Sequence, residues 1–435
     1  MENVCLFDST CKVFEKMNLI PNITYTTAHK LCTGCGLCEG ACPSHAIHME
    51  VNKGCFRPVV NNTTCKNSKG CHRCYDTCPG IGVDLLQLAR KYYTEGKTDR
   101  LMGRYLECFA GYSNDYDIRY HCASGGMVSQ FLIFLLEKGY IDGAVVTAFD
   151  AKAPLMVRSY IARTREEVLE GKSSKYAPVM FNRMIEEIKA ASGAYYIIVG
   201  LPCHIEGFRK YEQLDEQFRK KIAGYFSIYC SSGRSFYLTE YVFRERRIQK
   251  EKLTYFAYRD NGCLGNMVAK GKGIIHEENF QNYYHPLRSF FVPYRCTMCI
   301  DHYGELADIS FGDIHIEPYI HDKIGINSLI VRNSQMLEWL IEAKKEGVIT
   351  LNRITAETVN RSQVMAQIKK YRNSAFVYFN AILGRKIPVY DLLPRGGNRL
   401  KWLISYLHTN VQQFIGRNKV LWFLIPLLKG KAPRI

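Results

Sequence analysis

The chain has 435 residues, of which 47% are hydrophobic and 23% are charged, and this composition is ordinary for a globular protein of about two to four domains. Its eighteen cysteines are not ordinary. The first residues lack the charged-then-apolar pattern of a secretory signal, so a disulfide framework loses its premise. Metal binding in a reducing cytoplasm is the better interpretation of the cysteines.

The first cysteine run, CTGCGLCEGACP, begins at residue 32 and has the C-x2-C-x2-C-x3-C-P spacing of bacterial ferredoxins. A second run keeps the same ending, but its first gap is five residues instead of two. The cysteines of the two runs are Cys32, Cys35, Cys38 and Cys42, and then Cys65, Cys71, Cys74 and Cys78. The sequence therefore predicts a module with two [4Fe–4S] clusters.

The two runs also predict which cysteines share a cluster, because the cysteine before the proline reaches the other cluster. Crossing the fourth ligands gives one set of Cys32, Cys35, Cys38 and Cys78 and a second set of Cys65, Cys71, Cys74 and Cys42. Zinc and free thiols are the alternatives, but zinc sites typically show two separated CxxC pairs. Cys5, Cys11 and Cys55 have no spacing argument and are interpreted as ordinary thiols.

From about residue 120, apolar helical spacing alternates with short apolar runs. The predicted helices cover residues 123–139 and 181–191, and the predicted strands cover residues 143–149, 194–200 and 224–230. This alternation is typical of βαβ units, so we expect an α/β body with a mixed, mainly parallel sheet. Ser124, Gly125 and Gly126 precede the first helix, where backbone N–H groups either bind a phosphate or simply cap the helix.

Several segments, in a fixed order, resemble the coenzyme F420 hydrogenase/dehydrogenase beta-subunit family. They are CTGCGLCEGACP, ASGGMVSQFLIFLLEKGYIDGAVV, SSKYAPV, VGLPCHIEGFRKY, YRCTMC and ADISFGDIH, and the likeness extends from residue 32 to about residue 333. The resemblance implies an FAD-dependent fold fed by iron–sulfur clusters. It also implies that a deazaflavin or another organic substrate meets the flavin.

The resemblance implies site residues as well. A flavin phosphate loop corresponds to Ser124, Gly125 and Gly126. A segment that lines the flavin or substrate cleft corresponds to Ser174, Lys175 and Tyr176. The cofactor site also includes Pro202 and Asp313. His204 and Lys175 are the candidate catalytic residues, with a structural histidine and a solvated lysine as the alternatives. The family often has glutamine at position 204 and an aromatic residue at 314, so this chain leaves open whether coenzyme F420 is its substrate.

The body contributes a further group of cysteines, Cys203, Cys230, Cys296 and Cys299. Cys230 ends a predicted strand, and Cys296 and Cys299 form a CxxC pair. These soft ligands are able to hold a third cluster or a metal. A redox dithiol and ordinary buried cysteines are the alternatives.

The last part of the chain is strongly basic, and it contributes nearly half of the formal net charge of +17. Residues 392–435 contain no Asp or Glu, but they include Arg395, Arg399, Lys401, Arg417, Lys419, Lys429, Lys431 and Arg434. A predicted helix places on one face Leu400, Leu403, Ile404, Leu407, Val411, Phe414 and Ile415. This face either packs on the body or a partner, which is our first interpretation, or lies on an anionic membrane with Trp402 and Trp422 at the interface. The longest apolar run is far shorter than the ~20 residues of a membrane span.

These observations predict an iron–sulfur flavoprotein oxidoreductase that passes electrons between [4Fe–4S] clusters, FAD and an organic acceptor such as coenzyme F420. An electron-transfer subunit without its own flavin is the alternative, and a metal-stabilised scaffold at a membrane surface is a second one. The expected units are an N-terminal extension (1–25), a 2[4Fe–4S] ferredoxin-like domain (26–85), the two parts of an α/β flavin-binding body (86–215 and 216–375) and a basic, amphipathic helical tail (376–435).

The expected partners are a small-molecule redox substrate and an acidic ferredoxin or another electron-transfer protein, steered by the positive charge. No nucleic-acid-binding motif accompanies that charge. We expect a cytoplasmic protein, and membrane association through the tail stays open.

Overall fold

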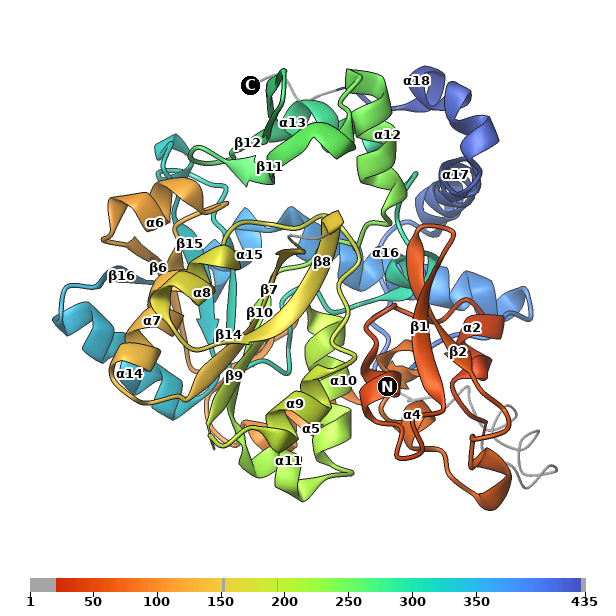
Figure 1. Ribbon diagram of the computed structural model, residues 1–435, viewed down its shortest axis with the longest axis horizontal. Coiled ribbons are helices and arrows are strands. Elements are labelled where there is room, and N and C mark those ends of the chain that lie inside the picture. Colours follow the sequence, from red (N-terminus) through yellow and green to blue (C-terminus); the bar gives the residue numbers. More distant parts are fainter. Residues whose placement is uncertain (1–20, 151–152, 194, 432–435) are drawn as a thin grey trace.

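The computed structural model describes residues 21–150, 153–193 and 195–431. Its centre is an eight-stranded sheet with helices on both faces, and a small cysteine-rich module lies beside it (Figure 1). The expected N-terminal extension, residues 1–25, lies mostly outside the described residues, as do Cys5 and Cys11.

The cysteine-rich module is built on one antiparallel hairpin of β1 (Ile47–Asn52) and β2 (Cys55–Val60). Short helices surround the hairpin, namely α2 (Thr24–Ala28), α3 (Leu37–Gly40) and α4 (Arg73–Asp76). The carbonyl of Gly54, in the hairpin turn, accepts a 2.8 Å hydrogen bond from the Phe236 amide of the body. The turn of the module is thereby fixed to the body.

The central sheet is mixed, as the sequence predicts, but it is not mainly parallel, because three of its strand pairings are parallel and four are antiparallel. Its strand order is β16-β6-β15-β14-β10-β9-β7-β8, and the inner strands β14, β10, β9 and β7 are parallel while the outer pairs are antiparallel. The strands are β6 (Glu107–Ser113), β7 (Gly143–Asp150), β8 (Ala153–Ala162), β9 (Tyr196–Gly200), β10 (Ile222–Ile228), β14 (Ile309–Asp313), β15 (Asn327–Val331) and β16 (Ile349–Ile354). The three strands predicted from sequence correspond to β7, β9 and β10.

The two faces of the sheet bury separate apolar clusters. One cluster contains the almost fully buried α7 (Met127–Glu137) together with α14 (Ser334–Lys345). The other contains α5 (Leu85–Tyr92), α9 (Met184–Ala190), α10 (Pro202–Glu212) and α11 (Glu216–Lys220). Two shorter helices, α6 (Tyr116–His121) and α8 (Arg165–Glu170), lie beside α7. The predicted helices 123–139 and 181–191 are thus found as α7 and α9, each shorter by a few residues.

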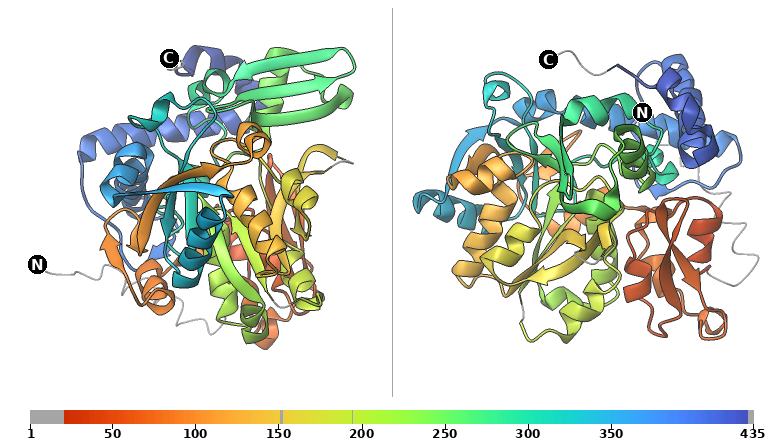
Figure 2. Two further views of the ribbon diagram at one scale, coloured as in Figure 1. Left: turned by 90° about the vertical axis from the view of Figure 1, so that its left-hand side faces the viewer. Right: turned by 45° about the horizontal axis from the view of Figure 1, so that its top comes forward.

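A second, three-stranded antiparallel sheet, which the sequence analysis did not predict, projects from the body (Figure 2). It consists of β11 (Leu253–Asp260), β12 (Asn266–Gly271) and β13 (Ile274–Asn279), and it is flanked by α12 (Tyr237–Arg246) and α13 (Phe280–Tyr283). The remaining long helix of the body is α16 (Val364–Ile382), which follows α15 (Ala356–Ser362). Short strand pairs join β3 (Gly82–Val83) to β17 (Val389–Tyr390) and β4 (Lys97–Asp99) to β5 (Gly103–Tyr105).

The C-terminal helix α17 (Arg399–Arg417) forms where the sequence predicts it, but its apolar face does not pack on the body, so that part of our first interpretation is wrong. Of the predicted core face only Ile415 is buried, and the other members are exposed, namely Leu400, Leu403, Ile404, Leu407, Val411 and Phe414. The physical reason is that α17 docks through side chains that form hydrogen bonds, such as Gln412 and Gln413. Trp422 is buried among aromatic rings instead of lying at an interface. No helix in the described parts of the chain is both long and apolar enough to cross a membrane.

A buried ion-pair group ties α10 to the central strands. The Arg209 guanidinium lies 3.0 Å from the Asp308 carboxylate and 3.3 Å from the Glu212 carboxylate. The Asp308 carboxylate also accepts a 2.8 Å hydrogen bond from the Tyr225 amide of β10. Buried charges persist only when they are paired, so this group holds α10, β10 and the start of β14 in one arrangement.

The variant Arg209→Met is expected to lose about 3–5 kcal/mol of unfolding free energy, because two buried carboxylates lose their counter-ion. Anaerobic urea denaturation followed by circular dichroism measures the loss. The matched control is Arg219→Met, which removes a solvent-exposed partner of Glu216 and is expected to change stability by less than about 0.5 kcal/mol. Equal stabilities of the two variants would contradict the proposed importance of the buried pair.

Candidate iron–sulfur and cofactor site

The first set of module cysteines converges around the start of α3. Cys32, Cys35, Cys38 and Cys78 are all buried. Burial raises the pKa of the Cys38 thiol well above its usual range, and the nearby thiols of Cys35, Cys32 and Cys78 raise it further. The structure thus brings Cys78 of the second run to the cysteines of the first run, which is the arrangement that crossed ligands require.

The second set forms around Cys74. Burial raises the pKa of the Cys74 thiol to about 12, and the neighbouring thiols of Cys42, Cys71 and Cys65 contribute to the increase. A single buried cluster contains Cys38, Cys42, Cys74 and Cys78, so the two sets adjoin. Within the described residues, no group of three or more His, Cys, Asp or Glu side chains is arranged around one ion. A cubane cluster gives each thiolate its own iron and therefore spaces its ligands more widely than a single ion does.

A third set of cysteines forms beyond the carboxyl ends of neighbouring parallel strands. Cys203 lies at the start of α10, directly after β9, and Cys230 follows β10. Cys296 belongs to the short 3₁₀ helix η5 (Tyr294–Met298), and Cys299 follows this helix. These four cysteines line one cavity of about 60 Å³. The cavity therefore gathers cysteines that are up to about a hundred residues apart in the sequence.

The same cavity lies against the module. Thr33, which follows Cys32, also contributes to its lining. On the body side, the Arg295 guanidinium donates hydrogen bonds to the carbonyls of Gly80 at 2.9 Å and Pro79 at 3.1 Å. These carbonyls belong to the residues directly after Cys78, and Arg295 precedes Cys296. One arginine thus bridges the first module set and the third set.

Buried polar groups surround the third set. The Lys369 ammonium of α16 donates to the carbonyl oxygens of Cys230 at 2.7 Å and Asp301 at 2.6 Å, and it also lines the cavity. Burial raises the pKa of the Glu206 carboxyl to about 8, and one of its oxygens has no hydrogen-bond partner in the described residues. A buried ammonium beside a neutral carboxyl makes this wall favourable to a thiolate-bound, anionic centre.

His204 lies on the cavity wall, but its Nδ1 atom is already used. Nδ1 accepts a 3.1 Å hydrogen bond from the Leu201 amide at the start of α10. Burial lowers the pKa of His204 to about 3, so the ring is neutral near pH 7 and its proton is on Nε2. This geometry supports the structural interpretation of His204, and the role as proton donor stays a prediction.

The segment Ser173–Tyr176 directly precedes Ala177, which lines the cysteine cavity. Lys175 turns back on this segment, because its ammonium donates to the carbonyls of Gly171 and Lys172 at 2.6 Å each. Burial lowers the pKa of Lys175 to about 7. Lys175 therefore closes the turn after α8, and its roles in the cofactor site and in catalysis stay predictions.

The residues on either side of Lys175 have different surroundings. The ring of Tyr176 packs against Phe280 and Tyr284, with ring centroids 5.2 and 4.4 Å apart. Ser174 is half-buried. Of the three residues that the resemblance places here, Tyr176 thus belongs to an aromatic group with Phe280 and Tyr284.

The loop before α7 packs closely on β15. A Cβ atom at Gly125 would lie 2.8 Å from the Asn327 amide, so packing by itself requires glycine at this position. The amide of Met127, the first residue of α7, donates to the Asn327 side chain. The amides of Gly125 and Gly126 have no hydrogen-bond partner within the described residues. These two donors are therefore the part of the predicted phosphate loop that an anion is able to use.

Asp313, at the end of β14, holds a buried arginine beside this loop. Its carboxylate lies 3.0 Å from the Arg259 guanidinium and 3.4 Å from His315 Nε2. Although burial acts in the opposite direction, Arg259 and His315 hold the pKa of Asp313 well below its usual range. Arg259 also donates a hydrogen bond to the carbonyl of Ala123, the residue before Ser124. Asp313 thus acts as a counter-ion that positions Arg259 at the loop.

Arg234 links the cysteine cavity to the aromatic group that contains Tyr176 and Tyr284, and the sequence analysis missed both Arg234 and Tyr284. Arg234 is buried, lines the cavity and lies 4.5 Å from the centre of the Tyr284 ring. Its guanidinium donates to Ser232 Oγ at 3.0 Å, and it forms no ion pair in the described parts of the chain. The only available signal was the position of Arg234 in a loop that follows a predicted strand, where α/β proteins bind ligands.

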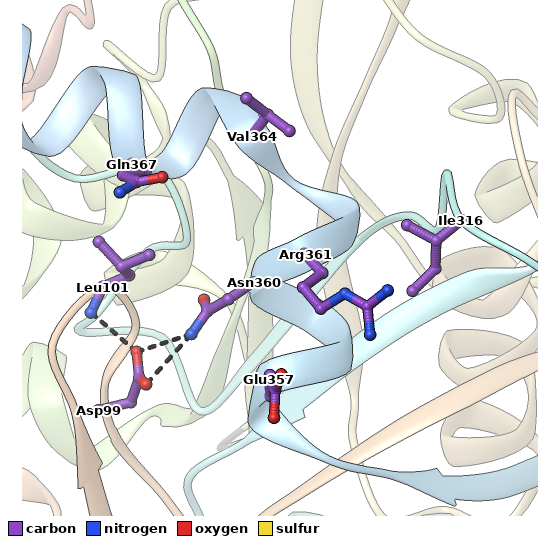
Figure 3. Close-up of a pocket in the computed structure, with 8 residues that line it drawn as sticks. All are labelled: Asp99, Leu101, Ile316, Glu357, Asn360, Arg361, Val364 and Gln367. Carbon is purple, nitrogen blue, oxygen red and sulfur yellow. Dashed lines mark hydrogen bonds between the residues drawn. The ribbon is translucent and has the colours of Figure 1, made fainter.

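A larger, open hollow of about 610 Å³ lies over α15 and the first turns of α16 (Figure 3). On its floor the Asp99 carboxylate accepts hydrogen bonds from the Asn360 side chain at 3.1 Å and from the Leu101 amide at 2.8 Å. None of the site residues predicted from sequence lines this hollow. The open hollow is therefore separate from the cysteine cavity.

Comparison with known protein families matches three parts of the chain. Two of the matches are to the coenzyme F420 hydrogenase/dehydrogenase beta subunit: its N-terminal part matches residues 108–186, and its C-terminal part matches residues 194–357. A "4Fe-4S dicluster domain" matches residues 31–92.

Individual relatives give the same result. Coenzyme F420 hydrogenase subunit beta of Methanosarcina barkeri is 24% identical over 289 residues, which are 62% of this chain and 94% of the relative. Coenzyme F420-dependent sulfite reductase of Methanocaldococcus jannaschii is 24% identical over 321 residues, which are 70% of this chain and 44% of the relative. A chain of the F420-reducing [NiFe] hydrogenase complex from Methanosarcina barkeri shares the fold with a TM-score of 0.54 and 19% identity, covering 68% of this chain and 99% of that chain.

The buried Lys175 predicts a pH dependence of stability. Its pKa of about 7 in the folded protein lies below the ordinary lysine value of 10.5, so the unfolded chain binds more protons between these values. Stability should therefore rise with pH from about 7 to about 10, by at most about 1.4 kcal/mol per pH unit. The variant Lys175→Met is expected to lack this rise, as measured by anaerobic urea denaturation across this range.

The matched control is Lys220→Met, which removes a solvent-exposed lysine. This control should keep the wild-type dependence on pH. A Lys175→Met variant with the same dependence as the wild type would show that Lys175 is protonated normally in the folded protein.

Proposed function

The chain belongs to the coenzyme F420 hydrogenase/dehydrogenase beta-subunit family, and on that premise we propose that it is an iron–sulfur flavoprotein oxidoreductase. The proposal rests on one observation: four body cysteines line a cavity that also touches the module, directly beside its first cysteine set. Electron-transfer centres are useful only when they adjoin one another and a redox site. The order of the three cysteine sets in space provides such a path.

The proposed clusters are two in the module and one in the body. The module sets are Cys32, Cys35, Cys38 and Cys78, and Cys65, Cys71, Cys74 and Cys42; the body set is Cys203, Cys230, Cys296 and Cys299. The chemistry that these clusters supply when bound is one-electron transfer at a potential set by their charge and surroundings. Within the chain, Lys369 places positive charge beside the body set, and burial of all four cysteines of the first module set shields that set from water.

We place FAD between the loop before α7 and the aromatic group that contains Tyr176, and we call this proposed site the flavin cleft. The observation that fits FAD there is a set of unsatisfied donors. They are the free amides of Gly125 and Gly126 and the buried Arg234, which lacks a carboxylate partner in the described residues. A pyrophosphate provides the negative charge that these groups lack. Bound flavin converts between one-electron and two-electron chemistry.

The organic substrate of this site is proposed to be coenzyme F420 or a similar two-electron carrier. The names of the relatives support this class, since they act in F420-dependent hydrogenase and sulfite reductase chemistry. The related chain of known structure comes from a hydrogenase complex, so a partner subunit or a ferredoxin is the proposed source or acceptor of electrons. In this chain His204 contributes an Nε2–H donor to the cavity wall, and Asp313 positions Arg259.

The alternative function is an electron-transfer subunit that holds the clusters but no flavin. One observation favours it: packing on β15 already explains Gly125, the central glycine of the predicted phosphate loop. The alternative and the main proposal agree on the clusters and differ only in the cleft.

Iron analysis tests the cluster assignment. Anaerobically purified protein is expected to contain about twelve irons and twelve sulfides per chain, as three cubane clusters require. Cys230→Ser should lower the iron content to about eight, because it removes a ligand of the body cluster alone. The matched control is Cys108→Ser, which alters a buried cysteine of β6 that does not line the cysteine cavity and should retain all of the iron. About eight irons in the wild type would contradict the body cluster, and zinc without iron would contradict all three.

Flavin analysis separates the two functions. The wild type is expected to release one FAD per chain. Arg234→Met should weaken FAD binding about tenfold to a hundredfold, because a charged hydrogen bond contributes about 1.5–3 kcal/mol. Fluorescence titration of flavin-depleted protein measures the affinity, and Arg219→Met, an exposed arginine, is the control. A full complement of iron without any flavin would favour the electron-transfer subunit.

A further inference from the structure

The C-terminal helix α17 turns an apolar face to solvent. We call this surface the outer face; it consists of Leu400, Leu403, Ile404, Leu407, Val411 and Phe414. At 3.6 residues per turn these side chains fall within an arc of about 100°. Leu407 is 58% exposed and Phe414 is 63% exposed. The outer face is therefore a continuous apolar stripe and not a set of scattered surface residues.

Hydrogen bonds on the opposite side of α17 fix this orientation. Gln412 accepts a 3.2 Å hydrogen bond from the Ser289 amide, and Gln413 donates to the Val292 carbonyl at 3.0 Å. Phe290 lies between Ser289 and Val292 in the sequence. The helix approaches this residue so closely that a Cβ at Gly416 would lie 1.7 Å from the Phe290 carbonyl oxygen. Rotating the helix to bury its apolar stripe would break both hydrogen bonds and this close packing. The outward orientation is therefore built into the contact.

The chain after α17 adds to the exposed apolar surface. It forms the 3₁₀ helix η7 (Lys419–Leu424) and then α18 (Ile425–Leu428). Buried Trp422 and Ile425 anchor this segment to the body together with half-buried Leu421 and Leu424, while four other large side chains are exposed. The exposed residues are Val420, Phe423, Leu427 and Leu428. The C-terminal unit thus repeats the pattern of α17, in which a few contacts hold it and its apolar side faces out.

The charged side chains of the C-terminal segment itself all have one sign, and one of them, Lys419, pairs with Glu240 of α12. Asp391 is the last acidic residue of the sequence, and eight lysines and arginines follow it. On α17, Arg399 and Lys401 lie about 100° to either side of Leu400, so they border the stripe on both edges. Both are exposed. A partner surface for this unit must therefore be apolar in its centre and negative at its rim.

We propose that the outer face docks this protein on the surface of an anionic phospholipid bilayer. The aliphatic and aromatic side chains would enter the boundary between headgroups and acyl chains, and Arg399 and Lys401 would bind lipid phosphates. A bilayer fits better than a protein partner because the stripe offers no hydrogen-bonding group along its length, whereas protein interfaces carry about one hydrogen bond per 100–200 Å². In the described residues no helix is able to span the membrane, so the contact is with its surface.

Sedimentation of the full, iron-loaded chain with sucrose-filled vesicles tests the proposal. Vesicles of equal parts phosphatidylcholine and phosphatidylglycerol are expected to sediment the wild type at low salt, and vesicles of phosphatidylcholine alone are expected to do so much less. The double variant Leu407→Gln/Phe414→Gln should reduce binding at least about tenfold. The double variant Arg399→Gln/Lys401→Gln should reduce binding to anionic vesicles and weaken its dependence on salt.

The matched control is Ile275→Gln, which replaces an aliphatic residue that is 91% exposed on β13, outside the outer face. This control should bind as the wild type does. All variants alter exposed side chains, so unchanged iron content and circular dichroism establish that they fold.

Two results would overturn the proposal. The first is wild-type protein that stays in the supernatant with anionic vesicles at low salt, or sediments equally well after Leu407→Gln/Phe414→Gln. The second is a wild type that is dimeric by light scattering without lipid and becomes monomeric in that double variant, because the outer face would then be a contact between two copies of the chain. Neither result bears on iron or flavin content, so failure here is distinct from failure of the proposed function.

Discussion

The site depends on one constraint, which is that the carboxyl ends of parallel strands meet at the same edge of a sheet. β9, β10 and β14 are neighbours in the sheet. Cys203 follows β9, Cys230 follows β10, and Asp313 is the last residue of β14. The Arg209–Asp308 pair holds these strands and α10 together beneath that edge. The cysteine cavity and the proposed flavin cleft are therefore two parts of one edge.

Charge explains why a polypeptide with this sequence needs its cofactors. Lys369 and Arg234 are buried cations that form no ion pairs in the described residues, and the thiols beside them have raised pKa values, chiefly through burial. A buried charge without a counter-ion is unfavourable. Iron bound by deprotonated thiolates would supply negative charge beside Lys369, and a pyrophosphate would supply it beside Arg234. On this view the folded chain and its anionic groups stabilise each other.

The sequence predicted most of what depends on local spacing. Both cysteine runs, the mixed sheet and helices α7, α9 and α17 follow from patterns within about twenty residues. Contacts between distant segments were not predictable: Arg234 meets Tyr284 through the unpredicted sheet β11–β13, and Arg295 meets Gly80 across more than two hundred residues. The orientation of α17 was misjudged for the same reason, because periodicity identifies an apolar face but does not say which face finds hydrogen-bond partners. Lys175 likewise binds carbonyls that are only a few residues away, which a motif comparison does not reveal.

The position of the C-terminal unit connects the proposed membrane surface to the redox centres. Its buried residues Ile415, Trp422 and Ile425 belong to the same apolar cluster as Tyr283, the neighbour of Tyr284 in the cleft wall. At the other side the Arg417 guanidinium, at the end of α17, lies close enough to Cys55 and Arg57 of the module to interact with their charges. The unit therefore touches both the module and the wall of the cleft. A bilayer bound at the outer face would thus be linked through the C-terminal unit to both the module and the cleft wall.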